Sequence, residues 1–289
     1  MKALNFLLFV VCLCAASQLY PQSYIFEYEF GDFKSSTAFY INSPGYIYLA
    51  DDEDNSLIKL DTLGNKIKEV GGYGWGESTF DTPTDIYATS LNVLICDKQN
   101  HRVKAFDKDL NFISELYSRD NAIPDERFGY PISCALSSMG DLYVLDSENI
   151  RVLKFDLFGK FVLNFGGFDA GIHSLKNPKK LAISSDNSIL VLEDSSIIMF
   201  DQFGNGKDII QLGKKFSSFN VEGSNMVLVT NNEVYHGWLI DGEIFLQKLN
   251  LIGIDKISNI IDCKMFNNKL YILTTKSILV FRKGSENSY

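Results

Sequence analysis

The chain has 289 residues, of which 46% are hydrophobic and 22% are charged, and its formal net charge is −9. This composition supports a sizeable hydrophobic core and excludes a largely disordered chain. Because nucleic-acid binding normally requires a basic surface, the acidic balance argues against a nucleic-acid partner.

Residues 1–17 have the features of a secretory signal peptide. Lys2 supplies a positive start, and Leu4–Ala16 is almost entirely apolar. This run is too short to span a membrane, which takes about 20 apolar residues. We therefore expect an exported protein that is periplasmic, extracellular or associated with the cell surface. Cleavage is expected near Ser17–Gln18, with Ser23–Tyr24 as the alternative.

The rest of the chain consists of short runs of alternating apolar and polar residues, separated by Gly, Asn and Asp. Such runs indicate β-strands joined by short turns, and their grouping indicates four antiparallel strands in each unit. Six units follow one another, at about residues 36–71, 83–117, 131–166, 178–212, 216–249 and 257–282.

An internal repeat supports this division into units. The stretch 92–107 returns at 141–156 with six residue types at the same offsets. The matched residues are Asp97, Asn100, Arg102, Val103, Phe106 and Asp107, followed by Asp146, Asn149, Arg151, Val152, Phe155 and Asp156. Repeated units of this length must stack on their neighbours to bury their apolar faces, so the repeat indicates the architecture.

The two ends of the chain complement each other. The sixth unit lacks a fourth strand, whereas the N-terminal run Tyr24–Phe30 is a strand without a unit. Adding this run to the sixth unit closes a ring and removes its exposed sheet edges. We therefore predict an all-β, six-bladed β-propeller over residues 18–289, with four-stranded antiparallel blades and an N-terminal closing strand. The alternative is a sandwich or barrel of many short strands.

At the repeated residues the chain resembles the NHL-repeat propellers, whose unit carries an Asp-x-x-Asn-His-Arg turn followed by Phe-Asp. The resemblance is strong in the first three units and weak in the last two; Ser56 stands at the Arg position of the first unit. It implies the propeller fold and leaves the activity open, because one fold hosts many functions. The matching residues of the second unit are Asp97, Asn100, His101, Arg102, Val103 and Phe106.

The Asp and Arg of the turn motif have a structural explanation. An Asp at a strand end and an Arg five residues later can face each other across a turn and form a charge-assisted pair. We therefore expect Asp97 with Arg102, and Asp146 with Arg151, to hold their turns together rather than bind a ligand.

Three long connections between units are the candidate binding region, namely Gly72–Thr82, Ser118–Tyr130 and Gly167–Asn177. They are expected on one face, where loops on a rigid scaffold often carry function. Aromatic residues and Arg are enriched at binding hot spots. The alternative is that these side chains pack the loops down. The candidate binding residues are Tyr73, Trp75, Arg119, Asp120, Arg127, Tyr130, Phe168 and His173.

Two classes of function are compatible with the sequence. The first is a non-catalytic, monomeric module that binds a protein, peptide or glycan and needs no cofactor. The second is a Zn- or Ca-dependent hydrolase or lyase with its site in the central channel. For zinc, His101, His173 and His236 would have to converge from three units; for calcium, Glu193 and Asp194 are candidates that no spacing singles out. No GxSxG motif indicates a serine hydrolase.

Overall fold

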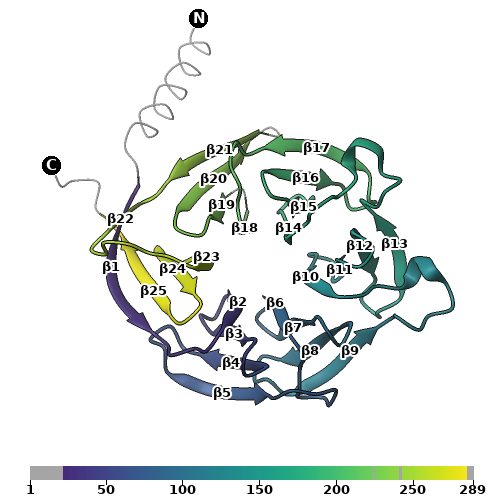
Figure 1. Cartoon of the computed structure of the whole chain (residues 1–289), viewed down its shortest axis with the longest axis horizontal. Coiled ribbons are helices and arrows are strands. Elements are labelled where there is room, and N and C mark those ends of the chain that lie inside the picture. Colours follow the sequence, from purple (N-terminus) through teal and green to yellow (C-terminus); the bar gives the residue numbers. More distant parts are fainter. Residues whose placement is uncertain (1–21, 224, 241–242, 285–289) are drawn as a thin grey trace, which may run out of the picture.

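The computed structural model describes residues 22–223, 225–240 and 243–284, so the predicted export segment lies outside the described residues. Within these ranges six β-sheets stand around a central axis as the blades of a propeller (Figure 1). This arrangement confirms the predicted fold class. No helix in the described ranges is both long and apolar enough to cross a membrane.

The blades follow one another in chain order, and the first strand of each blade lies innermost, next to the axis. Blade 1 consists of β2 (Ser36–Ile41), β3 (Ile47–Asp51), β4 (Ser56–Leu60) and β5 (Lys66–Gly71). Blade 2 consists of β6 (Pro83–Ala88), β7 (Asn92–Asp97), β8 (Arg102–Asp107) and β9 (Phe112–Tyr117). Blade 3 consists of β10 (Pro131–Leu136), β11 (Leu142–Asp146), β12 (Arg151–Phe155) and β13 (Phe161–Phe165).

The second half of the ring is built in the same way. Blade 4 consists of β14 (Lys180–Ile183), β15 (Ile189–Leu192), β16 (Ser196–Phe200) and β17 (Gly206–Gln211). Blade 5 consists of β18 (Ser218–Glu222), β19 (Asn225–Val229), β20 (Val234–Ile240) and β21 (Glu243–Lys248). Blade 6 consists, from the axis outward, of β23 (Ile260–Phe266), β24 (Lys269–Thr274), β25 (Ile278–Lys283), β1 (Ser23–Phe30) and β22 (Asn250–Ile252).

The middle strands of the blades are buried along most of their length. All five residues of β3 are buried, whereas the outermost strand β5 alternates between exposed and partly buried residues. Neighbouring blades cover both faces of a middle strand, so that strand has no face that needs polar residues. The interface between blades 1 and 6 shows this packing, with Phe39 and Leu49 in one buried cluster with Val280.

In four blades, an aspartate side chain stabilises the turn between the third and fourth strands by accepting hydrogen bonds from two backbone N–H groups of that turn. In blade 1, Asp61 accepts the backbone N–H groups of Leu63 and Asn65, both at 2.9 Å. Gly64, at a φ of +89°, adopts the left-handed conformation that the turn requires. Equivalent aspartate bonds occur at residues 107–111, 156–160 and 201–205. The need for this side chain explains the recurring acidic residue after the third strand.

Ring closure occurs in blade 6, as predicted. Strand β1 pairs antiparallel with β25 from Tyr24 opposite Lys283 to Phe30 opposite Ile278. The structure adds a fifth strand that the sequence did not indicate, because β22 pairs with β1 in parallel. Strand β22 covers the edge that β1 would otherwise expose, and such covering protects a sheet against pairing with other chains.

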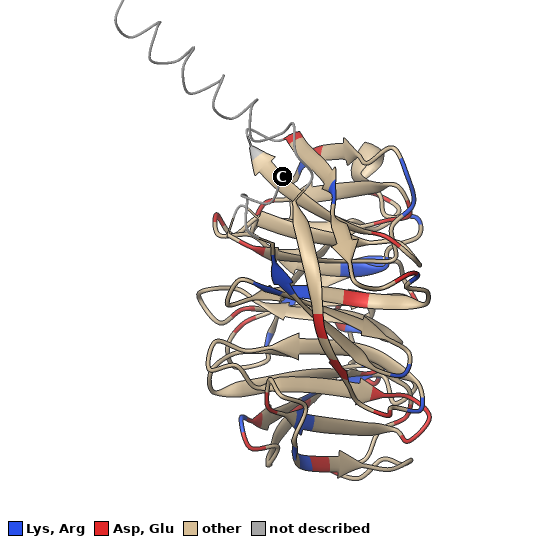
Figure 2. Ribbon diagram, turned by 90° about the vertical axis from the view of Figure 1, so that its left-hand side faces the viewer, with Lys and Arg blue, Asp and Glu red and all other residues tan. Residues whose placement is uncertain are grey.

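The ring has two faces. The long connections between blades emerge together with the turns between second and third strands, and we call this side the long-loop face. The turns between first and second strands and between third and fourth strands emerge on the other side, the short-turn face. Figure 2 shows the ring edge-on, with many acidic and basic residues in turns at the two faces.

Removal of the closing strand should destabilise the ring and make the protein associate. A chain that begins at Asp32 lacks β1, so β25 loses its partner and presents an unpaired edge. We expect a lower melting temperature and higher oligomers in light scattering. A chain that begins at Gln22 is the control and should remain monomeric. An Asp32 chain that stays monomeric with an unchanged melting temperature would contradict this role of β1.

Candidate functional site

The first long connection, residues 72–82, is held in place by two cations of β8. Arg102 and Lys104 are both almost fully buried. The Arg102 guanidinium donates to the carbonyl of Trp75 at 2.9 Å, and the Lys104 amine donates to the carbonyls of Glu77 and Thr79 at 2.9 and 2.7 Å. Burial, followed by the Arg102 charge, lowers the pKa of Lys104 to about 8. Side chains of β8 therefore fix the backbone of this loop.

The two aromatic side chains of this loop differ in how far they reach into solvent. Tyr73 is 77% exposed. Trp75 is 61% exposed, but its ring lies 5.3 Å from the Arg102 guanidinium and contacts Tyr117 edge-on at 6.5 Å. Tyr73 therefore faces solvent, whereas Trp75 both covers a buried cation and presents part of its ring at the surface.

Arg119, at the start of the second connection, joins several turns. Its guanidinium binds both carboxylate oxygens of Glu148 at 2.9 and 3.0 Å, and it donates to Nδ1 of His101 at 3.1 Å. The backbone N–H of Tyr130 also donates to this Nδ1, and the rings of His101 and Tyr130 contact each other edge to face, with their centroids 4.2 Å apart. Burial and the Arg119 charge lower the pKa of His101, so its ring is neutral at pH 7. Arg119 and Tyr130 are thus used to fold the loop onto blade 3.

The remainder of the second connection contains the short 3-10 helix η1 (Pro124–Glu126). Arg127 donates to the carbonyls of Asn121 and Ala122 at 2.5 and 3.2 Å, so its guanidinium is occupied within its own loop. Asp120 is exposed and accepts the hydroxyl of Tyr117 at 3.2 Å. Ile123 is 54% exposed beside these residues.

The third connection, residues 167–177, presents two apolar side chains around the 3-10 helix η2 (Gly171–His173). Phe168 is 98% exposed and Ile172 is 80% exposed. His173 has a different environment, because its ring lies against the backbone of Gly206, where a Cβ would approach its Cγ to 2.2 Å, and 6.3 Å from the ring of Phe200. His173 therefore packs this loop against blade 4.

The eight candidate binding residues thus separate into two groups. Arg119, Arg127, Tyr130 and His173 make the contacts that fold the connections. Tyr73, Trp75, Asp120 and Phe168 are exposed on the long-loop face. Sequence reasoning missed Ile123 and Ile172, because it considered only aromatic and charged residue types in these loops. The signal that could have identified them is a large aliphatic side chain within a long connection between blades.

The Asp–Arg pairs of the turn motif differ between blades 2 and 3. In blade 2, Arg102 Nε donates to Asp97 at 2.7 Å and both side chains are buried. In blade 3, Arg151 Nε lies 3.5 Å from Asp146 and has no hydrogen-bond partner in the described part of the chain. Its Nη2 instead donates to the carbonyl of Arg127 at 2.8 Å. The first pair is a short charge-assisted bond, whereas Arg151 mainly supports the second connection.

A lysine joins two carboxylates across the central axis. The Lys180 amine of β14 lies 2.6 Å from Asp262 of β23 and 3.9 Å from Asp85 of β6. Ser133 donates to Asp85 at 2.5 Å, and Ser218 donates to Asp262 at 2.8 Å. Burial favours the neutral form of each group, so it raises the pKa of Asp85 and acts to lower the pKa of Lys180. The two carboxylates outweigh burial at Lys180, and the pKa of its amine is raised. This axial cluster links the innermost strands of blades 2 to 6.

The histidines considered for zinc do not meet at this axis. His101 lies in a turn of blade 2, His173 lies in the third connection, and His236 lies on the third strand of blade 5. Glu193 accepts backbone N–H groups of residues 176 and 177, and Asp194 pairs with two lysines. Across residues 22–223, 225–240 and 243–284, no three His, Cys, Asp or Glu side chains form a group that could hold a metal ion.

The two turn arginines should contribute unequally to stability. Arg102→Met leaves the buried Asp97 carboxylate unpaired and removes donors to the first connection, so we expect a loss of about 3–5 kcal/mol. Arg151→Met removes a longer, weaker ion pair, and a loss of about 1–2 kcal/mol is expected. Urea denaturation of both variants measures these losses. Equal losses would show that geometry does not control the strength of the pair.

The axial cluster provides a second stability test. Lys180→Met leaves Asp85 and Asp262 close together without their cation, and we expect a loss of about 3–5 kcal/mol in the free energy of unfolding. Lys66→Met is the matched control, because its ion pair with Glu69 is exposed and screened by solvent and should contribute little to stability. A similar small loss in both variants, measured by urea denaturation, would contradict a stabilising role for the axial lysine.

No protein-family model matches the chain. Two curated proteins match part of it, and both are NHL-repeat proteins. Protein brain tumor of Drosophila melanogaster is 28% identical over 145 residues, and the B-box type zinc finger protein ncl-1 of Caenorhabditis elegans is 27% identical over 141 residues. Each match covers 47% of this chain but only 13% and 16%, respectively, of those much longer proteins.

Solved structures share the ring over most of its length. A streptogramin B lyase has a TM-score of 0.61 at 13% identity, with 89% of this chain and 97% of that chain covered. A catalytically inactive virginiamycin B lyase from Staphylococcus aureus, solved with quinupristin, has a TM-score of 0.62 at 11% identity over 88% and 98% of the two chains. A gluconolactonase from Xanthomonas campestris has a TM-score of 0.64 at 10% identity over 88% of both chains. At these identities the likeness shows the fold alone: the chain is a six-bladed β-propeller, similar in part to NHL-repeat proteins.

Proposed function

We propose that the protein is a divergent NHL-repeat propeller that is exported and acts as a non-catalytic, monomeric binding module. Its long-loop face would bind a protein or peptide. One observation carries this proposal: the three long connections combine a backbone held by side-chain hydrogen bonds from the blades with large apolar side chains that face solvent.

A fixed backbone makes exposed apolar residues effective in binding. Side chains that are already positioned lose less conformational entropy when a partner covers them. The long-loop face presents Tyr73 and part of Trp75 on one loop, Ile123 on the next, and Phe168 with Ile172 on the third. Aliphatic side chains beside aromatic rings suit the apolar centre of a protein interface. A glycan would instead require polar partners around each ring, so a protein or peptide is the favoured ligand class.

The distribution of the connections supports one binding arc. The loops between blades 1 and 4 span residues 72–82, 118–130 and 166–179, whereas the connection from β17 to β18 spans only residues 212–217. The ring is therefore elaborated on one side of the long-loop face. Since a propeller repeats the same scaffold around its axis, local elaboration of this kind indicates selection for a surface rather than for stability.

The alternative, a metal-dependent hydrolase or lyase, has less support in the channel. The axial carboxylates Asp85 and Asp262 already have Lys180 and serine hydroxyls as partners. Elemental analysis of the purified protein tests the alternative directly. Stoichiometric zinc or calcium that resists dialysis would favour the enzyme and overturn the non-catalytic assignment.

Substitution of exposed residues on each face tests the proposed binding surface. We expect Tyr73→Ser, Phe168→Ser and Ile172→Ser together to reduce partner capture by at least about tenfold, since hot-spot residues contribute more than about 1 kcal/mol each. The matched control replaces Leu157, Phe158 and Phe203 by Ser, which are equally apolar and exposed in turns of the short-turn face. Capture by immobilised full-length protein is quantified by mass spectrometry, and melting temperatures confirm folding. Greater loss from the control set would show that the partner binds the short-turn face instead.

A further inference from the structure

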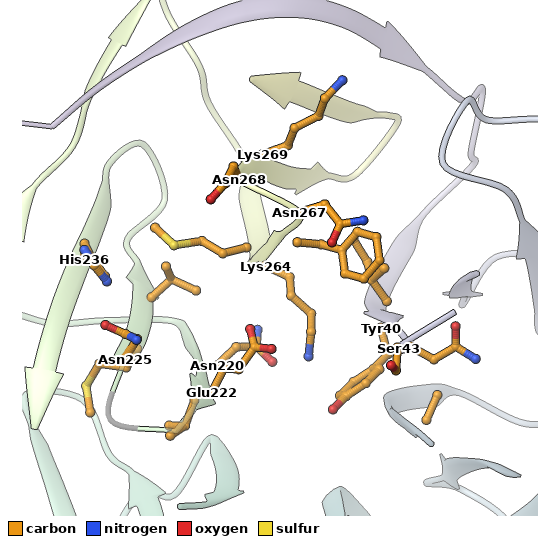
Figure 3. Close-up of a pocket in the computed structure, with 18 of the residues that line it drawn as sticks. Tyr40, Ser43, Asn220, Glu222, Asn225, His236, Lys264, Asn267, Asn268 and Lys269 are labelled. Carbon is orange, nitrogen blue, oxygen red and sulfur yellow. The ribbon is translucent and has the colours of Figure 1, made fainter. Parts of the chain in front are cut away.

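A cavity of about 760 Å³ opens on the short-turn face, opposite to the proposed binding surface. Its walls come from the turns between first and second strands of blades 1, 2, 5 and 6, and it extends between blades 5 and 6 to Tyr24 and Lys283. Ligand-binding sites commonly have volumes of about 300–1,000 Å³. We call this space the short-turn cavity; Figure 3 shows it with Lys264 near its middle and His236 at one end.

His236 is a buried polar side chain without a partner. It lies on β20, is only 7% exposed, and lines the short-turn cavity. Neither ring nitrogen has a hydrogen-bond partner, and the only close ring contact in the described part of the chain is Trp238 at 4.2 Å. Burial lowers the pKa of His236, and the nearby Lys283 charge acts in the same direction. A neutral imidazole offers one donor and one acceptor, and leaving both unused is costly.

Lys264 is a cation without an anionic partner in the same cavity. Its amine lies 3.5 Å from the centroid of the Tyr40 ring, and no ion pair joins it to a carboxylate of the described residues. The cavity is lined by the three lysines Lys264, Lys269 and Lys283 but by a single carboxylate, Glu222. The amine of Lys269 is already bound to Glu27 at 2.6 Å, outside the lining. The cavity therefore has an excess of positive charge although the whole chain carries −9.

The remaining walls combine aromatic rings with amide groups. Tyr40 and Tyr87 contact each other at 5.2 Å, and Phe266 also lines the cavity. Rings of this kind pack against the apolar faces of a sugar, while amides exchange hydrogen bonds with its hydroxyl groups. The amide side chains that line the cavity and are exposed are Asn225, Asn267 and Asn268.

We propose that the short-turn cavity binds an acidic sugar, either a uronic acid or a short oligosaccharide that contains one. The carboxylate pairs with the amine of Lys264, and a hydroxyl group of the sugar bonds to one of the unpartnered nitrogens of His236. The proposal goes beyond the protein-binding function of the long-loop face and uses none of its residues. A carboxylate supplies the missing anion, and hydroxyl groups, which both donate and accept, match a neutral imidazole.

The affinity of this site should depend on pH in one direction. Burial and the nearby Lys180 charge lower the pKa of Lys264 to about 8, so the amine is largely protonated at pH 7. Because a carboxylate binds the protonated amine, affinity should be constant from pH 6.5 to about 7.5 and fall as the pH rises through about 8. The charged groups that act on this amine are Lys180 of β14, Glu222 of β18 and Asp262 of its own strand β23, and the amine lies over the Tyr40 ring of β2. The other titratable groups that line the cavity are Tyr24, Tyr87, His236, Lys269 and Lys283.

Isothermal titration calorimetry with the full chain tests the proposal. The probes are a trisaccharide of galacturonic acid, the neutral trisaccharide of galactose, and inorganic phosphate. We expect the acidic trisaccharide to bind about tenfold more tightly than the neutral one, because only the acidic one can form a charge-assisted hydrogen bond with the Lys264 amine. Lys264→Met should remove this difference and the pH dependence, whereas Lys160→Met, an exposed lysine of the same face, should change neither.

His236→Phe separates binding from folding. If the imidazole serves the ligand, a ring of the same shape should weaken binding several-fold while the melting temperature of the free protein stays the same or rises, because an unpaired buried polar group is lost. A lower melting temperature with unchanged affinity would assign His236 to structure and overturn its role. The proposal also fails if acidic and neutral trisaccharides bind equally, if Lys264→Met retains full affinity, if no acidic sugar binds, or if phosphate binds as tightly as the acidic trisaccharide.

Discussion

Pairing between the two ends of the described chain is the constraint on which the rest of the structure depends. Strand β1 completes blade 6 by antiparallel pairing with β25, so the first strand stays without its partner until the last blade has formed. Such a long-range contact carries a loop-closure cost, and its benefit is that every blade then packs against two neighbours. The blade interfaces, the axial cluster and the cavity between blades 5 and 6 all exist only in the closed ring.

Buried cations shape the interior and the loops of this propeller. Lys180 is held by carboxylates from two other blades, and Arg102 and Lys104 are held largely by loop carbonyls. Burying a charge is costly, so a buried lysine or arginine is tolerated only where its partners have a defined position. Each of these groups therefore specifies one arrangement of its surroundings: the first orients five innermost strands, and the other two orient the connection between blades 1 and 2.

The two faces of the ring differ in which groups are left unsatisfied. On the long-loop face the polar backbone is bonded and apolar side chains such as Phe168 face water. On the short-turn face a cavity keeps His236 without hydrogen bonds and Lys264 without a counter-ion. Unsatisfied groups of this kind are expected at sites where a protein binds a ligand or a partner. The unsatisfied groups are apolar on the long-loop face and polar or charged on the short-turn face, which suits two different classes of ligand on opposite faces.

Local patterns determined the architecture, and contacts distant in the chain decided the sites. Alternation, the recurring Asp turns and the unmatched terminal strand were sufficient for the six-bladed ring, since each depends on residues near one another or on strand count. Spacing could not predict the contacts of Arg127, His173 and Arg151. Arg127 bonds to backbone carbonyls of its own loop, His173 packs against a glycine of blade 4, and Arg151 bonds to a carbonyl of the second connection. Strand β22 lies in blade 6, and the short-turn cavity is lined by turns of blades 1, 2, 5 and 6, so neither follows from the pattern within one repeat unit. The sequence indicated His236 only as one of three zinc candidates, because its lack of partners is a property of the space between two blades.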